Sequence, residues 1–250
     1  MPLLVDRYHR AGFTPLDAVL PKETCQLLNH ELTHRRNTSF FDRTGFGLLG
    51  QNAWNNIPLF ADVLTEFRIP QYAGELLQLT EVLLFQDLII WKPPHSERQV
   101  EWHQDYSYWP LNAPKGVTLW IALDDSSEDN GAMRYIPESH KWGECQPTVY
   151  TLSDSFQQES ELPSLPLQGH EMDGVFVNSV QGSAIAHHPL CCHMSPINNS
   201  STNRRAWSLT FLDPSVGWDP EHAPHPLNHQ LQLHRHTPLK NGHFPLFSID

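Results

Sequence analysis

The sequence predicts a mainly β protein of the α+β class, a β-sandwich or jelly roll with helices flanking it on the N-terminal side. The 250 residues include 21 prolines and only 39% hydrophobic residues, a composition that favours strands and loops over a helical bundle. Apolar residues recur at helical spacing only within about the first 80 residues, and short strand-like runs follow. Helices followed by a series of short strands are typical of this class.

Three helices are expected in the N-terminal part, over residues 15–36, 57–66 and 70–79. In the first, Pro21 sits near a helix start, and apolar side chains recur at helical spacing at Leu20, Cys25, Leu27, Leu28 and Leu32. The later apolar runs are short and separated by turn formers such as DDSSEDNG. They predict strands over residues 82–92, 117–123, 132–137, 183–189 and 205–212.

These elements predict one domain over residues 1–250, with a helical flank over about 1–80, a jelly-roll core over about 82–212 and a tail over 213–250. Residues 145–175 are rich in Ser, Gln, Glu and Pro and lack periodicity, which is typical of a lid, a binding loop or a disordered segment. The tail carries histidines whose spacing fits no metal motif, so we expect them to be solvated: His222, His225, His229, His234, His236 and His243.

The charge pattern argues against several classes of partner. The net charge is −12 and no basic cluster is present, so neither nucleic acid nor an anionic membrane is an expected partner. No apolar run is long enough to span a bilayer, and the N-terminal stretch MPLLVDRYHRAGF has no signal-peptide apolar region. The four cysteines show no spacing of a zinc site, so we expect reduced thiols and a cytoplasmic location.

The stretch WHQDYSYWP, residues 102–110, places an imidazole and a carboxylate two residues apart, at His103 and Asp105. On a strand these side chains would face the same side, as one edge of a facial triad that needs a second histidine from elsewhere. Taken alone, H-x-D is a weak motif, because it occurs often by chance. An ordinary structural role of the two residues is then favoured over metal binding. The candidates for the third ligand lie downstream, at His187, His188 and His193.

His193 is followed by Ser195 and, eleven residues after the histidine, by Arg204. A guanidinium one strand further on can point into the same barrel and grip a carboxylate in two places. A metal held on one face by His103, Asp105 and His193 keeps positions free for a bidentate 2-oxoacid and dioxygen. The combination of H-x-D, a histidine about 90 residues later and an arginine eleven residues after that histidine is far more specific than any of its parts.

At this point the region from about Val82 to Leu212 resembles the phytanoyl-CoA dioxygenase family of iron(II)/2-oxoglutarate oxygenases. The resembling pieces are FQDLIIWK, WHQDYSYW, TLWIALDDSSEDNGAMRYIPESHKWG and HPLCCHMSPINNSSTNRRAWSLTF, in the family's order and near its spacing. The resemblance implies a double-stranded β-helix, the cupin-like jelly roll, which agrees with the strand pattern.

The resemblance also implies roles for individual residues. It implies His103, Asp105 and His193 as iron ligands, and Arg204 as the partner of the far carboxylate of 2-oxoglutarate, with Ser195 beside it. Further co-substrate contacts are implied for Trp120 and Lys92, and substrate-side candidates are Gln86, Trp109, Tyr106 and His187.

The activity implied is that of an iron(II)- and 2-oxoglutarate-dependent dioxygenase. Such an enzyme uses 2-oxoglutarate and O2 as co-substrates, forms succinate and CO2, and oxidises, by default hydroxylates, a C–H bond of a small-molecule metabolite. The acidic chain makes a CoA thioester less favoured as substrate, and the carboxylate at Asp105 argues against halogenation. Three alternatives stay open: a cupin-like hydrolase or isomerase with another metal, a catalytically silent binding module, and a structural jelly roll with a chance triad.

Overall fold

The computed structural model of the chain describes residues 2–44, 47–148, 162–225, 227–231, 233–240 and 242–249. The α-helices are α1 (Pro2–Ala11), α2 (Lys22–Arg35), α3 (Ala53–Asn56), α4 (Pro58–Glu66), α5 (Ile69–Leu77) and α6 (Leu227–Leu231). The first six strands are β1 (Phe13–Leu16), β2 (Phe41–Thr44), β3 (Gly47–Gln51), β4 (Glu81–Lys92), β5 (Val100–His103) and β6 (Gly116–Ala122). The others are β7 (Met133–Tyr135), β8 (Val175–Val177), β9 (Ala184–His187), β10 (His193–Ser195), β11 (Arg204–Leu212) and β12 (Leu246–Ser248). Short 3-10 helices include η1 (Tyr106–Tyr108), η2 (Glu128–Asn130), η3 (Ser139–Trp142) and η5 (Glu171–Asp173).

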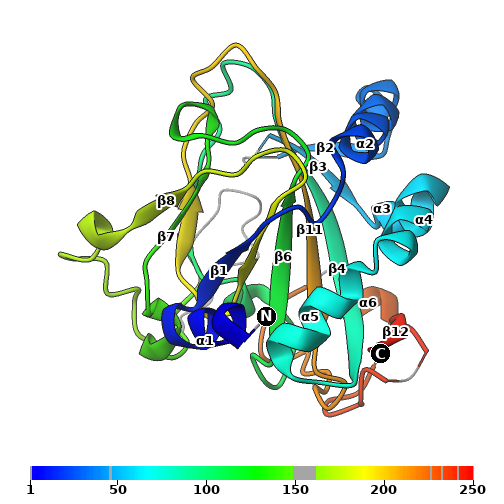
Figure 1. The fold of residues 1–250 in the computed structure, drawn as a ribbon. Coiled ribbons are helices and arrows are strands. Elements are labelled where there is room, and N and C mark those ends of the chain that lie inside the picture. Colours follow the sequence, from blue (N-terminus) through cyan, green and yellow to red (C-terminus); the bar gives the residue numbers. More distant parts are fainter. Residues whose placement is uncertain are drawn as a thin grey trace.

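The strands form two antiparallel sheets. The major sheet is eight-stranded, with the order β1-β9-β6-β11-β4-β3-β2 and with β12 also paired to β4. The minor sheet is four-stranded, with the order β5-β10-β7-β8. Figure 1 shows β7 and β8 on one side of the long strands β4, β6 and β11, and the helices α2, α4 and α5 on the other. Two antiparallel sheets that face each other are the arrangement expected for a jelly roll.

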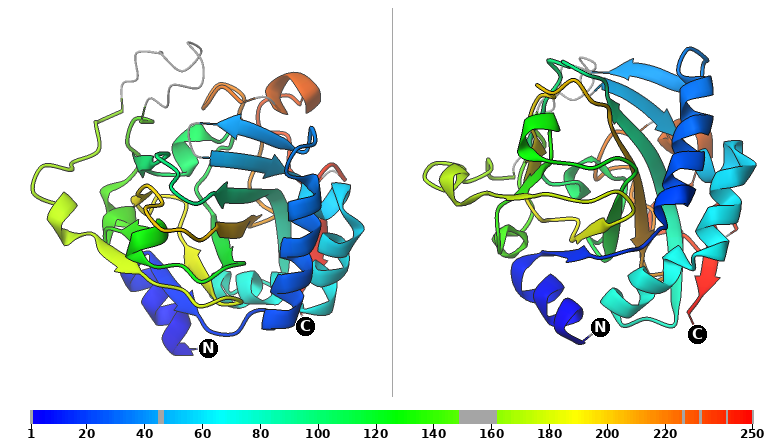
Figure 2. Two further views of the ribbon diagram at one scale, coloured as in Figure 1. Left: turned by 90° about the horizontal axis from the view of Figure 1, so that it is seen from above. Right: turned by 45° about the horizontal axis from the view of Figure 1, so that its top comes forward.

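Alternation along β4 explains this layering. Its odd-numbered residues Ile89 and Trp91 are buried and belong to the large apolar cluster that also contains residues of α2, α4 and α5. Its even-numbered residues Gln86, Leu88 and Ile90 are only partly buried, because they face a cavity between the two sheets. One face of the major sheet therefore carries the helices, as both views in Figure 2 indicate, and the other face borders the cavity.

The expected helices over 57–66 and 70–79 correspond to α4 and α5, but the helix expected over 15–36 was wrong in its first part. The chain up to Leu16 is the strand β1, which pairs with β9, and α2 begins only at Lys22. Pro21 has an extended ψ of 149°, and Ala18 has a positive φ of 50°. Leu20 is buried without being helical. Apolar spacing alone does not separate a buried loop from a helix.

The expectation that the tail histidines are solvated was wrong for His222 and His225. The tail packs on the molecule, because β12 pairs with β4 and Trp218 is buried. His222 contacts the carbonyl oxygen of Trp109 through Nδ1, at 2.6 Å, and His225 lines the cavity.

Of the segment 145–175 that lacks periodicity, residues 149–161 lie outside the described residues. All four cysteines carry free, buried thiols. Within the part of the chain that the structure describes, no helix is both long and apolar enough to cross a bilayer.

Candidate metal and co-substrate site

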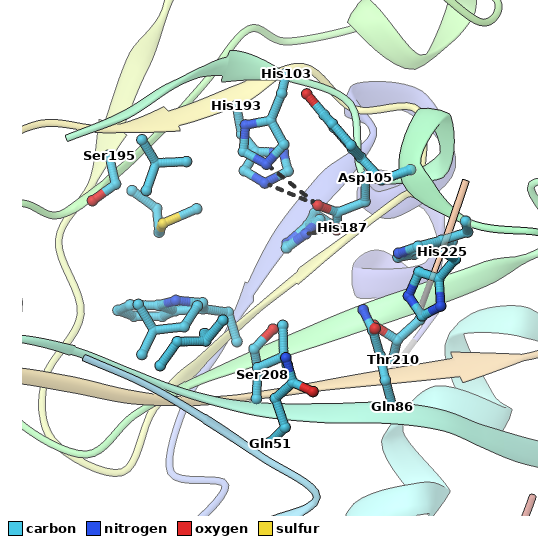
Figure 3. Close-up of a pocket in the computed structure, with 18 of the residues that line it drawn as sticks. Gln51, Gln86, His103, Asp105, His187, His193, Ser195, Ser208, Thr210 and His225 are labelled. Atoms are coloured by element: carbon cyan, nitrogen blue, oxygen red, sulfur yellow. Dashed lines mark hydrogen bonds and ion pairs between the residues drawn. The ribbon is translucent and has the colours of Figure 1, made fainter. Parts of the chain in front are cut away.

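A cavity of about 340 Å³ lies between the two sheets. The major sheet contributes side chains from β3, β4, β6, β9 and β11 to its wall, and the minor sheet contributes side chains from β5, β7 and β10. Polar groups gather at several points of a mostly apolar wall, as is typical of small-molecule sites. Figure 3 shows these groups pointing into a common space.

His103, Asp105 and His193 meet at this cavity and form the cluster of potential metal ligands found among the described residues. His103 ends β5 and His193 begins β10, and the two are direct partners in the sheet register. Asp105 Oδ1 lies 3.4 Å from Nε2 of His103 and 3.6 Å from Nε2 of His193. The three potential ligand atoms all lie within 4.8 Å of one another, so one ion could contact all of them.

The sequence pattern suggested that His103 and Asp105 converge because they lie on one face of a strand. The structure brings them together in a different way. Strand β5 ends at His103, and Asp105 has helical angles, φ −63° and ψ −42°, immediately before η1. The chain therefore turns between the two residues, and the turn brings the carboxylate back to the imidazole. The intervening Gln104 points away and binds backbone groups, including the carbonyl oxygen of Leu190 at 2.9 Å.

Backbone contacts orient both imidazoles for metal binding. Nδ1 of His103 lies 2.8 Å from the carbonyl oxygen of Glu101, and Nδ1 of His193 lies 2.8 Å from that of Cys191. Since a carbonyl can only accept, each Nδ1 carries the hydrogen, and each neutral ring keeps a lone pair on Nε2. Burial, followed by the neighbouring His103, holds the pKa of His193 well below its usual value, so this ring stays neutral.

Asp105 is held from the opposite side. Its Oδ2 lies 3.1 Å from Nε2 of His187 and accepts a hydrogen bond from Thr118 Oγ1 at 3.3 Å. His187 is fixed in turn by Tyr135, whose hydroxyl lies 3.1 Å from Nδ1. These contacts leave Oδ1 directed at the two histidines. Burial acts to raise the pKa of Asp105, but the surrounding imidazoles, including His187 with its hydrogen bond, outweigh it, so the pKa lies well below its usual value.

Arg204, the first residue of β11, is 1% exposed at the cavity wall. Its Nη2 donates to Ser195 Oγ at 2.7 Å, whereas Nε and Nη1 are buried with no acceptor among the described residues. Its guanidinium carbon lies 5.3 Å from the centroid of the Trp120 ring, whose Nε1 is also buried without an acceptor in that part of the chain. Burial lowers the pKa of Arg204 to about 10, so it remains a cation at neutral pH. Unpaired buried donors of this kind predict an anionic ligand.

Lys92 does not line the cavity, although the family resemblance implied it as a co-substrate contact. Its Nζ contacts Ser195 at the carbonyl oxygen, at 2.9 Å, and at Oγ, at 2.7 Å, and it also contacts the carbonyl oxygen of Pro196. Ser195 Oγ itself donates to the carbonyl oxygen of Gly131 at 2.9 Å. Lys92 therefore lies behind Ser195 and fixes it. Burial, together with the nearby Arg204, lowers the pKa of Lys92 to about 5.

The substrate-side candidates divide into two groups. Gln86, Trp109 and His187 line the cavity, but both ring nitrogens of His187 already have partners. Tyr106 does not line it, because its hydroxyl donates to the carbonyl oxygen of Leu111 at 2.9 Å and its ring packs on His222.

Several lining residues were not foreseen from the sequence. Ser208 and Thr210 lie on the face of β11 that carries Arg204, so counting every second residue from Arg204 would have found them. Gln51 lies on β3, which the sequence analysis did not predict, and His225 lies in the tail. No local pattern marks these two positions.

The sequence and the fold of this chain are both similar to those of known proteins. The sequence profile of the phytanoyl-CoA dioxygenase family matches residues 8–206. A relative from Bos taurus, phytanoyl-CoA dioxygenase domain-containing protein 1, is 31% identical over 171 residues, which cover 66% of this chain and 56% of the relative. The chain thus matches little more than half the length of that relative.

Two solved structures resemble nearly the whole chain. The non-heme α-ketoglutarate-dependent carbocyclase SnoK from nogalamycin biosynthesis superposes with a TM-score of 0.79 at 22% identity, covering 99% of this chain and 96% of SnoK. The epimerase SnoN, in complex with Fe3+, α-ketoglutarate and nogalamycin RO, superposes with a TM-score of 0.77 at 20% identity, covering 98% and 97%. These superpositions confirm the predicted jelly-roll fold.

Proposed function

Since the chain belongs to the phytanoyl-CoA dioxygenase family, we propose that it is an iron(II)- and 2-oxoglutarate-dependent dioxygenase acting on a small molecule. The reaction is the oxidation, by default the hydroxylation, of a substrate C–H bond, with 2-oxoglutarate and O2 converted to succinate and CO2. One observation carries this proposal: a cluster of two histidines and one carboxylate shares its cavity with a buried guanidinium that has two donors without acceptors among the described residues.

The donor set fits iron(II). His103, Asp105 and His193 would occupy one face of the ion, and this facial arrangement leaves the opposite positions for other ligands. Both imidazoles present Nε2, and the carboxylate presents Oδ1 because Oδ2 is occupied by His187 and Thr118. When bound, the metal would supply the activation of dioxygen.

The unpaired donors fit a dicarboxylate. Arg204 would bind the carboxylate of 2-oxoglutarate that lies far from the metal, through Nε and Nη1, which have no acceptor among the described residues. Trp120 Nε1 is a further free donor on the same wall. Ser195 and Lys92 hold the guanidinium in place from behind, and this support preorganises the site before the co-substrate arrives. The apolar parts of the wall would exclude water from the reacting groups.

Calorimetry under anaerobic conditions tests this proposal. We expect the wild type to bind one equivalent of Fe(II), and to bind 2-oxoglutarate much more tightly once Fe(II) is present. His193→Ala should remove the metal binding, whereas His34→Ala, on the exposed face of α2, should leave it unchanged. Metal binding without 2-oxoglutarate binding would instead indicate a different metal chemistry, and folded protein without metal binding would indicate a structural role for the triad.

A further inference from the structure

One end of the cavity carries the carboxamide of Gln86 and the imidazole of His225. Figure 3 shows Gln86 and His225 next to each other below Asp105, while Ser195 lies at the far end of the same space. Both side chains line the cavity. Among the described residues, neither the amide of Gln86 nor Nε2 of His225 has a hydrogen-bond partner. Polar groups that converge on a cavity without partners mark a place for a ligand.

A β-bulge places Gln86 at this end. The pairing of β11 with β4 shifts after Thr210, which lies opposite Gln86, so that Phe85 is skipped in the register. Bulges redirect side chains next to binding sites. Here the bulge turns Phe85 to the inner side beside Gln86, where its ring centroid lies 5.7 Å from that of Trp109 and 6.3 Å from that of His225. Phe85 thus packs behind both rings that border the space.

His225 is fixed as a hydrogen-bond donor. The backbone N–H of Leu227, at the start of α6, donates to Nδ1 of His225 at 3.2 Å. Burial lowers the pKa of His225 to about 4, so the ring is neutral at physiological pH. A neutral imidazole that accepts at Nδ1 carries its hydrogen on Nε2. The ligand atom facing Nε2 must therefore be an acceptor.

This end of the cavity offers no cationic partner to an anionic ligand: the one Lys or Arg side chain among the described lining residues, Arg204, is bonded to Ser195 at the far end. The carboxylate of Glu221, which lines an outer depression that shares His225 with the cavity, is paired with Arg235. Glu144 lies near the same end, where its Oε1 is 2.8 Å from Nε2 of His222. Two neutral donors do not offset the cost of removing a carboxylate from water.

We propose that Gln86 and His225 form the substrate subsite, and that they donate hydrogen bonds to a carbonyl oxygen of an uncharged, largely apolar ring compound held beside Trp109 and Tyr108. This inference deepens the proposed function and rests on it, since it names the substrate class of the same site. The aromatic walls suit flat rings, and the two donors fix the position of the carbonyl relative to the metal ligands. By the same reasoning, a substrate carboxylate does not bind between Gln86 and His225.

Matched probes test the subsite. We would measure dissociation constants by ligand-observed NMR for 1-indanone, 1-tetralone and anthrone, each against its parent hydrocarbon and its ring carboxylate. The protein is loaded with Zn(II) and 2-oxoglutarate, so that no turnover occurs. At least one ketone should bind at least tenfold more tightly than the matching carboxylate and roughly three- to tenfold more tightly than the hydrocarbon, as expected for neutral hydrogen bonds.

Substitutions locate the effect. Gln86→Leu and His225→Phe should each remove the preference for the ketone, while the hydrocarbon binds as before. Gln86→Met and His225→Leu serve as second variants if either of the first pair does not fold. The matched controls Gln26→Leu and His34→Phe, both on α2, should retain the wild-type preference.

The outcome separates this inference from the proposed function, because binding of Fe(II) and 2-oxoglutarate is measured on separate, metal-free aliquots of the same protein preparations. If that complex forms but no ketone is preferred, or the preference survives in the Gln86 and His225 variants, the subsite is wrong and the oxygenase stands. If the wild type does not form the complex, the proposed function fails whatever the probes do.

Discussion

Replacing Arg204 with leucine is expected to weaken 2-oxoglutarate binding greatly without destabilising the protein. Nε and Nη1 lack acceptors in the described structure, so two charge-assisted hydrogen bonds would be lost. Each is worth about 1.5–3 kcal/mol, so together they amount to about 3–6 kcal/mol, or roughly a hundredfold to ten-thousandfold in the dissociation constant. The free protein should not be destabilised, because the substitution removes a buried cation with two unpaired donors.

The neighbouring Arg205 provides a matched control with the opposite signature. Its Nε and Nη2 pair with the two carboxylate oxygens of Asp124 at 2.7 and 2.8 Å, on the other side of β11. Arg205→Leu should therefore lower the melting temperature by several degrees and leave 2-oxoglutarate affinity unchanged. Calorimetry in the presence of Fe(II) and thermal unfolding measure both quantities. The reasoning is refuted if Arg204→Leu retains wild-type affinity, or if both variants weaken binding equally.

Three further predictions concern residues around the site and in the core. His187→Phe should weaken Fe(II) binding roughly ten- to a hundredfold, because Asp105 loses the group that orients it; an unchanged affinity in calorimetry would remove His187 from this role. Burial raises the pKa of Asp87 from 3.8 to about 6, although hydrogen bonds such as that from the Trp207 indole oppose the shift. The folded state therefore favours the protonated acid. Protonated Asp87 stabilises the fold fully below about pH 4, and this stabilisation is lost as the pH rises through about 6. The difference in unfolding free energy between wild type and Asp87→Asn should accordingly change by on the order of 3 kcal/mol across that window in urea titrations, and a constant difference would contradict the assignment. Gly182→Ala should cost at least about 2 kcal/mol, since Gly182 has a φ of +89° and an added Cβ would collide with the carbonyl oxygen of Leu20; an unchanged melting temperature would show that this turn can adjust.

The elements with a strong local signal could be predicted from the sequence. The strand over 82–92 corresponds to β4, and the one over 205–212 corresponds to β11, because short runs rich in apolar and aromatic residues are typical of buried strands. The cluster of His103, Asp105 and His193 was likewise found from spacing and resemblance, and the structure brings these side chains together.

Features that depend on long-range packing could not be predicted. The bulge at Phe85 depends on the register with β11, which no local pattern records. His225 reaches the cavity because the tail packs against the rest of the molecule. The spacing of the histidines in the tail does not predict this contact. The chain leaves the strand conformation between His103 and Asp105. A change over two residues is too short to be detected from the periodicity of apolar residues.

The central claim is that one cavity holds iron(II) and 2-oxoglutarate in contact with each other. An anaerobic titration of the Fe(II)-loaded protein with 2-oxoglutarate tests it most directly, because chelation of the metal by the 2-oxoacid end produces a visible metal-to-ligand charge-transfer band. The band should appear with one equivalent of co-substrate in the wild type and be absent in His193→Ala. Folded protein that binds iron but develops no band would contradict the claim.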